Sequence, residues 1–162
     1  MRVDPLQVLT KLAAAQNIPT RRVTPPFEGL DEFDYGLRRS LDPQFDWQEF
    51  GQLLLDNTPE QTLLFVEGTF ELHFALFRIP DEENTVFLVG PWTFGQRSEK
   101  SRKWVKRHLG VAGESAVQEY YNGVKVLEAN DFYSTIRVLV GMMFDEDELK
   151  VEQMKEFLPF QF

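Results

Sequence analysis

The sequence has no cysteine, only two histidines and no long apolar run. Without cysteine the chain can form neither disulfides nor thiolate metal sites, and it is compatible with a reducing compartment. No stretch approaches the roughly 20 apolar residues that a helix needs to cross a bilayer. At the N-terminus, Asp4, Gln7 and Lys11 interrupt the apolar core that a signal peptide would require. We therefore expect a cytoplasmic protein that does not contact a membrane.

Positive charge is also scarce, because 17 Lys and Arg residues stand against 26 Asp and Glu residues, which gives a net charge of −9. A chain this acidic is unsuited to holding nucleic acid across a broad surface, since phosphate binding relies on clustered Lys and Arg. Residues 96–108 are the exception, because Lys and Arg crowd this segment. We interpret it first as the solvated face of a helix. A docking surface for an acidic patch is the alternative, and direct DNA contact is least favoured.

Complete catalytic and metal-binding motifs are missing as well. Ser115 lies in Gly113–Val117, which lacks the second glycine of a nucleophile elbow, so we predict that it caps a helix. His73 and His108 are far apart and have no acidic residue at ligand spacing. The run Asp145–Glu148 lacks the alternating ligands and central glycine of a calcium loop. We therefore expect no catalytic residue, no metal and no cofactor, and an enzyme with dispersed catalytic residues is the least favoured hypothesis.

What the chain does contain is phenylalanine, at 15 residues in 162, within an ordinary apolar content of 43%. This length favours one domain with a sizeable core. An aromatic-rich interior suits plain core packing, and it also suits a pocket for an organic ligand.

The clearest local structure runs from Thr62 to Trp92. It predicts three strands with short turns, which must therefore be antiparallel: Leu63–Glu67, Phe70–Ile79 and Thr85–Val89. Alternation along the second strand places apolar side chains on both faces, so we expect both faces to be covered. The third strand closes on a Gly90-Pro91 turn before Trp92.

Helices are predicted on both sides of these strands from apolar spacing, capping residues and breakers. The segment from Ile18 to Gln44 is rich in proline and reads least clearly, with a strand near Arg21–Thr24 and a helical turn or short strand over Asp31–Leu41. The predicted helices are Pro5–Gln16, Asp46–Asn57, Ser98–Leu109 ended by Gly110, a short helix from Ser115, a largely buried helix from Asn130 or Asp131 to Met143, and a final helix that carries Leu149, Val151, Met154 and Leu158.

The order of these elements resembles a known family over roughly Trp47 to Met143. A strand that ends in Phe87-Leu88-Val89-Gly90-Pro91-Trp92 is followed by a helix with Trp104-Val105, a Tyr120-Tyr121 pair and an apolar helix. This pattern resembles the N-terminal sensory domain of AraC-type transcription regulators from Gram-positive bacteria. The resemblance implies an α+β, PAS/GAF-like (profilin-like) fold with an antiparallel sheet and flanking helices. It also implies that DNA is bound by a separate helix-turn-helix domain, so we expect these 162 residues to be a fragment of a longer regulator.

We therefore predict that residues 1–162 form a single ligand-sensing and dimerisation domain that is not an enzyme. It would bind a small organic effector, form a homodimer and contact DNA only through the absent domain. A protein–protein interaction module without a ligand is the alternative. The predicted effector pocket consists of Phe65, His73, Phe77, Phe87 and Trp92.

Overall fold

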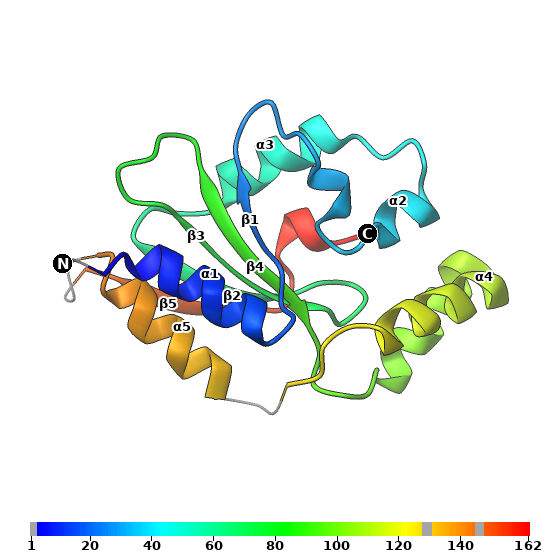
Figure 1. Ribbon diagram of the computed structural model, residues 1–162. Coiled ribbons are helices and arrows are strands. Elements are labelled where there is room, and N and C mark those ends of the chain that lie inside the picture. The colour runs from blue at the N-terminus through cyan, green and yellow to red at the C-terminus, as the bar shows by residue number, and fades with distance from the viewer. Residues whose placement is uncertain (1–2, 128–130, 145–147) are drawn as a thin grey trace.

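The computed structural model describes residues 3–127, 131–144 and 148–162, and within them the chain has an α+β fold with a mixed sheet flanked by helices (Figure 1). The strand order is β1-β4-β3-β2-β5. The strands are β1 (Thr20–Val23), β2 (Thr62–Glu67), β3 (His73–Arg78), β4 (Val86–Trp92) and β5 (Lys150–Met154). The α-helices are α1 (Pro5–Ala15), α2 (Leu37–Leu41), α3 (Trp47–Asn57), α4 (Glu99–Asn122) and α5 (Asp131–Gly141), and the 3-10 helices are η1 (Leu30–Glu32) and η2 (Leu158–Phe160).

The three-stranded meander is confirmed, because β2, β3 and β4 pair antiparallel in chain order. β3 begins later than predicted, at His73 instead of Phe70, since residues 68–72 form a tight loop in which Gly68 donates its N–H to the Leu72 carbonyl at 3.1 Å. The strand predicted near Arg21–Thr24 is also present, as β1 on the outer side of β4. Local patterning was therefore sufficient to place the centre of the sheet.

The prediction of a wholly antiparallel sheet is wrong, because β5 pairs parallel with β2. The same residues were predicted to form a final helix. The free edge of β2 instead supplies hydrogen-bond partners to this segment, and Lys150 donates its N–H to the Gln61 carbonyl at 2.8 Å. Pairing with a strand far away in sequence outweighs a weak helical pattern. The acidic residues 145–147 lie outside the described residues.

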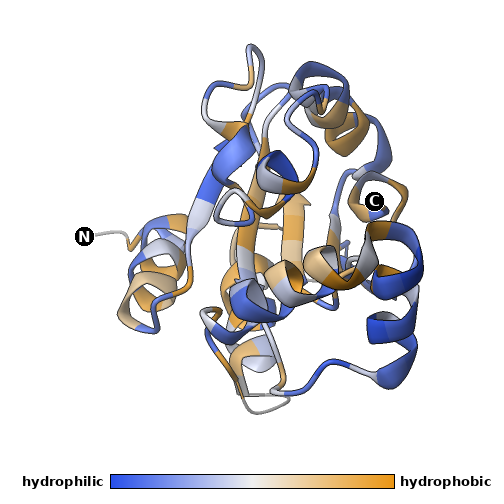
Figure 2. Cartoon of the chain, turned by 90° about the vertical axis from the view of Figure 1, so that its right-hand side faces the viewer, coloured by the Kyte–Doolittle hydropathy of each residue, from blue (hydrophilic) through white to orange (hydrophobic). Residues whose placement is uncertain are grey.

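Both faces of the sheet are covered, as the alternation predicts. Phe74 and Leu76 belong to the apolar layer formed with α3, η2 and α4, whereas Ala75 and Phe77 belong to the layer formed with α1 and α5. α1 and α5 lie side by side on one face, and α3 and η2 lie on the other (Figure 1). In Figure 2 the central strands are mostly hydrophobic, and hydrophilic turns lie around them. The sheet therefore separates two apolar layers.

Gly90-Pro91 does not form a turn. It lies inside β4, where its peptide bond is cis and the pairing with β3 is shifted between His73 and Ala75. Gly90 has a φ of +129°, and a Cβ atom there would lie 2.7 Å from the His73 carbonyl oxygen. The glycine is therefore required because two backbones approach each other closely.

The caps predicted for two helices are confirmed. The Asp46 carboxylate accepts the Glu49 N–H at 3.0 Å at the start of α3, and the Ser98 hydroxyl accepts the Ser101 N–H at 3.1 Å at the start of α4. Gly110 interrupts α4 with non-helical angles (φ 75°, ψ −179°), as expected of a break at this position. Helix resumes directly afterwards, so Ser115 lies inside α4, and its predicted capping role is wrong.

α5 is less buried than predicted. Phe132, Ile136 and Val140 are buried against the sheet, but Val138 is 63% exposed and Met142 is 60% exposed. α5 is therefore an amphipathic surface helix with a narrow apolar contact stripe. None of the helices in the described part of the chain is both long enough and apolar enough to cross a bilayer.

Candidate functional site

The predicted pocket residues lie on the face of the sheet that α1 and α5 cover. Phe65, Phe77, Phe87 and Trp92 are at most 5% exposed. Phe77 and Phe87 pack at 5.6 Å between ring centroids, and Phe65 lies 4.3 Å from Tyr133 on α5. Neighbouring side chains fill the space between these rings, and the rings pack against α1 and α5. A ligand could contact them only by displacing part of this layer.

His73 differs from the other four predicted residues, because it lies half-buried at the end of the layer. Its ring is 4.4 Å from Phe94 and 6.4 Å from Trp92, measured between ring centroids. Burial lowers the pKa of His73 to about 4, although Glu71 opposes this shift. The imidazole is therefore neutral near pH 7. The structure thus brings His73 and Trp92 together, and it places Phe77 and Phe87 at a separate contact.

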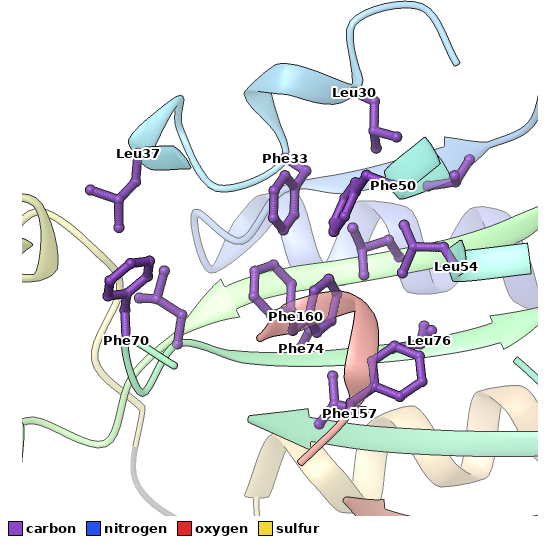
Figure 3. Close-up of a cluster of buried hydrophobic side chains, with 14 of the residues drawn as sticks. Leu30, Phe33, Leu37, Phe50, Leu54, Phe70, Phe74, Leu76, Phe157 and Phe160 are labelled. Atoms are coloured by element: carbon purple, nitrogen blue, oxygen red, sulfur yellow. The ribbon is translucent and has the colours of Figure 1, made fainter. Parts of the chain in front are cut away.

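The opposite face of the sheet carries a feature that the sequence did not indicate. Phe157–Phe162, which we call the C-terminal segment, lies between the sheet and α3, with Phe157 1% exposed and Phe160 fully buried. The ring of Phe160 stacks on Phe33 at 5.7 Å and 9° and lies 4.8 Å from Phe74 (Figure 3). The chain's own residues therefore occupy the centre of an aromatic slot.

A buried arginine holds this segment in place. Arg38 on α2 is 3% exposed, and its Nη2 and Nη1 groups donate to the carbonyl oxygens of Phe160 and Gln161, the latter at 3.4 Å. Four aromatic rings surround the guanidinium, with centroids 5.5–5.8 Å from Cζ: Phe33, Phe45, Phe50 and Phe162. Such rings favour a cation electrostatically. We refer to Arg38 and its partner Asp34 as the arginine clamp.

The Asp34 carboxylate is only partly satisfied by hydrogen bonds and by its ion pair with Arg38. The Arg38 N–H donates to Asp34 Oδ2 at 3.1 Å, and Arg38 Nε lies 3.9 Å from the same oxygen. Asp34 is 1% exposed, and Oδ1 has no hydrogen-bond partner among the residues that the structure describes. Burial raises the pKa of Asp34 to about 6, against the opposing effects of Arg38 and neighbouring backbone N–H groups. For the same reason burial lowers the pKa of Arg38 to about 10, and Asp34 only partly offsets this.

Little unused space remains at the clamp, but solvent lies close by. A cavity of about 10 Å³ beside Asp34, Arg38 and Phe160 holds at most a single water molecule. A shallow hollow of about 480 Å³ opens where the C-terminal segment meets the first turns of α4, and Trp104, Gln161 and Phe162 lie in its lining. The buried Phe160 is therefore followed directly in the chain by residues that line an open surface.

The basic residues of segment 96–108 have two different roles. Arg97 is taken up in an ion pair, with its Nη2 2.6 Å from Glu114 Oε1 and its side chain fully buried. Because Arg97 precedes α4 and Glu114 follows Gly110, this pair ties the segment before α4 to the second half of the kinked helix. The remaining cations are exposed on one stretch of helix, which confirms the solvated face: Lys100, Arg102, Lys103, Lys106 and Arg107.

Sequence reasoning missed the clamp and the segment that it holds. Asp34 and Arg38 have the i, i+4 spacing of a helical ion pair, and Phe33 and Leu37 beside them are apolar. This signal lies in the proline-rich stretch, where the sequence left a helical turn and a short strand open over Asp31–Leu41; the structure has the helical form, as η1 and α2. The described residues contain no group of three or more acidic, histidine or cysteine side chains that could hold a metal ion. Comparison with known proteins gave no match, whether to a protein-family model, to a curated protein or to a solved structure.

Proposed function

We propose that this domain senses a small organic effector without catalysing a reaction, and that the effector binds at the arginine clamp. The observation that carries the proposal is the buried Asp34–Arg38 pair, whose carboxylate is only partly hydrogen-bonded. Burying an ion pair contributes little to stability compared with apolar residues of similar size. A buried ion pair is therefore better explained by binding than by a contribution to folding.

The surroundings of the clamp support a binding role over catalysis. Aromatic rings line it, and the one guanidinium donates two N–H groups side by side, which is the pattern of a site that orients a ligand. His73, the histidine inside the sheet, lies on the opposite face from Arg38. Arg38, with a pKa of about 10, remains a cation at neutral pH and is unsuited to accepting a proton.

The finer parts of the proposal concern the parent protein. We propose a PAS/GAF-like (profilin-like) arrangement for this α+β fold and a sensory role in an AraC-type transcription regulator of the cytoplasm. The support is the order of strands and helices around Phe87–Trp92 and Tyr120-Tyr121. DNA binding is assigned to a separate helix-turn-helix domain.

Thermal-shift screening tests the sensing role directly. The full chain is screened with sugars, amino acids and small aromatic acids, and at least one class is expected to raise Tm. Arg38→Met is expected to abolish that rise. Arg39→Met is the matched control, because the Arg39 side chain is 51% exposed on the same helix. The absence of any shift in the wild type would refute the sensing role, and a shift retained in Arg38→Met would place the site elsewhere.

We propose homodimerisation, or a role as an interaction module without a ligand, from a different part of the structure. The apolar character of both sheet faces is now explained by the chain's own helices. Some apolar surface stays exposed at α5, where Val138 and Met142, the residue after the helix ends, are more than half exposed. A dimer in light scattering that dissociates in the Val138→Glu, Met142→Glu double variant would support this role. A strictly monomeric wild type at high concentration would exclude self-association.

A further inference from the structure

We propose that the C-terminal segment is a built-in occupant of the effector site, and that the effector is a small aromatic carboxylate that displaces it. In this arrangement the ligand ring replaces the ring of Phe160, and its carboxylate takes the two N–H groups of Arg38. The inference rests on the proposed sensing function and adds to it the class of ligand and the part of the chain that responds.

The hydrogen bonds of Arg38 define the polar end of the ligand. Two nitrogens of one planar guanidinium donate to two oxygens, the carbonyls of Phe160 and Gln161. A carboxylate presents two oxygens to the same fork, with stronger, charge-assisted bonds. One carboxylate can therefore satisfy the donors that two backbone carbonyls now occupy.

The slot around Phe160 defines the apolar end. Its walls are Phe33, Phe50 and Phe74, at centroid distances of 5.7, 6.0 and 4.8 Å from the Phe160 ring. Phe33 follows η1, Phe50 lies on α3 and Phe74 lies on β3, so the walls do not depend on the C-terminal segment (Figure 3). The slot fits a flat ring, and stacking on these walls favours an aromatic one.

The distance between ring and carboxylate follows from the residue that is replaced. In a phenylalanine residue two carbon atoms separate the ring from the carbonyl carbon. 3-Phenylpropionate has the same separation, and it ends in a carboxylate. This compound therefore copies both contacts of Phe160 with the clamp and the slot, and it serves as the probe.

The segment can leave without breaking the sheet. Besides Arg38, the backbone bonds that tie it to other elements involve Thr69, whose N–H donates to the Phe160 carbonyl at 3.4 Å and whose hydroxyl accepts the Phe162 N–H at 2.9 Å. Leu158 is 62% exposed, and residues 155–156 before the segment are exposed too. Few bonds to other elements and exposed flanks allow the segment to open as a unit, and the free-energy cost of opening is mainly that of exposing Phe157 and Phe160.

The charge at the site also permits an added anion. Arg38 on α2 and the Tyr120 hydroxyl on α4 face Asp34, and Arg38 is the only cation of the three. Because the pKa of Asp34 already lies near 6, a proton on Asp34 can relieve the repulsion of a second carboxylate. The site would then hold one anion and one cation.

Hydrogen exchange measured by mass spectrometry, together with calorimetry, tests the proposal on the full chain at pH 7. 3-Phenylpropionate is expected to bind and to increase amide exchange in residues 157–162 while β2 and β3 stay protected. 3-Phenylpropanol lacks the carboxylate and propionate lacks the ring, so both are expected to bind at least about tenfold more weakly. Arg38→Met is expected to lose binding, and Arg39→Met is expected to keep it.

Phe160→Ala removes the competing ring. We expect it to bind 3-phenylpropionate at least about tenfold more tightly than the wild type, because the binding-competent state is then more populated. If this variant does not fold, Thr69→Val removes the acceptor of the Phe162 N–H without emptying the core, and a smaller gain in affinity is expected.

The outcomes separate the two proposals. Binding without increased exchange in residues 157–162, or equal affinity in Phe160→Ala and the wild type, overturns displacement while the sensing role stands. If 3-phenylpropionate binds neither the wild type nor Phe160→Ala, this ligand class is overturned. If the broad thermal-shift screen is also negative, the sensing role fails with it.

Discussion

Removing the cation of the arginine clamp is expected to destabilise the domain far more than removing both charges. Arg38→Met leaves the Asp34 carboxylate, 1% exposed, without its partner. Breaking a buried pair from one side costs about 3–5 kcal/mol of unfolding free energy. Asp34→Asn combined with Arg38→Met keeps an acceptor for the backbone N–H of residue 38 and carries no charge. We expect the double variant to lie within about 2 kcal/mol of the wild type, since it loses only the bonds to the segment carbonyls.

The assay is urea unfolding at pH 7, followed by circular dichroism for the wild type, both single variants and the double variant. We expect a coupling free energy of at least about 2 kcal/mol between positions 34 and 38. If the double variant is as unstable as Arg38→Met, the clamp is needed for folding, and its charges no longer point to a ligand.

The pH dependence of Asp34→Asn adds an independent check. The folded-state pKa of Asp34, about 6, lies above its ordinary value of 3.8, so the folded protein keeps a proton that the unfolded chain has lost. The contribution of this group to stability is therefore fully present well below pH 3.8 and is lost as the pH rises through 6. Relative to Asp34→Asn, the wild type should lose about 2 kcal/mol between pH 4 and pH 7.

Three further predictions concern other parts of the fold. His73→Gln should show the opposite pH effect, because the folded-state pKa of His73 is about 4. The unfolding free energy of the wild type should rise relative to that of the variant between pH 4 and 6.5, by at most about 3 kcal/mol. A difference between the two proteins that does not change with pH in urea titrations would contradict burial of the ring. Gly90→Ala should lower stability by about 3 kcal/mol or more, because its Cβ would meet the His73 carbonyl oxygen, and wild-type Tm in the variant would disprove the close approach. Gly51→Ala should cost about 1–3 kcal/mol, since its Cβ would lie 2.4 Å from the Phe27 ring, and the additional substitution Phe27→Leu should recover part of this loss in calorimetry.

The parts of the fold that sequence patterns predicted correctly depend on local contacts. The strands around Leu63 and Phe74, the helix capped by Asp46 and the two-sided burial of β3 all follow from alternation or capping within a few residues. β5 was missed because its partner, β2, is distant in the chain and only the pairing makes Lys150–Met154 extended. Periodicity carries no information about such a partner.

The candidate site was missed for a related reason. Phe160 and Arg38 are 122 residues apart, and their contact exists only after the C-terminal segment has packed on the sheet. The predicted residue His73 was recognised as a polar group among aromatic rings, which is a local signal. The predicted ligand role of Phe65 and Phe77 was inferred from their aromatic character, and that character serves a core as well as a pocket.

The short connection between β5 and the C-terminal segment has a consequence for the sensitivity of a sensor of this kind. Only residues 155–156 separate Met154 at the end of β5 from Phe157. A group tethered this closely competes for its site at an effective concentration in the millimolar range, whatever the protein concentration. An external ligand must therefore reach a concentration high enough to displace the tethered segment before the sensor responds. Inserting glycine and serine residues after Lys155 would dilute the tethered competitor and lower the ligand concentration at half-response, with every residue at the site unchanged.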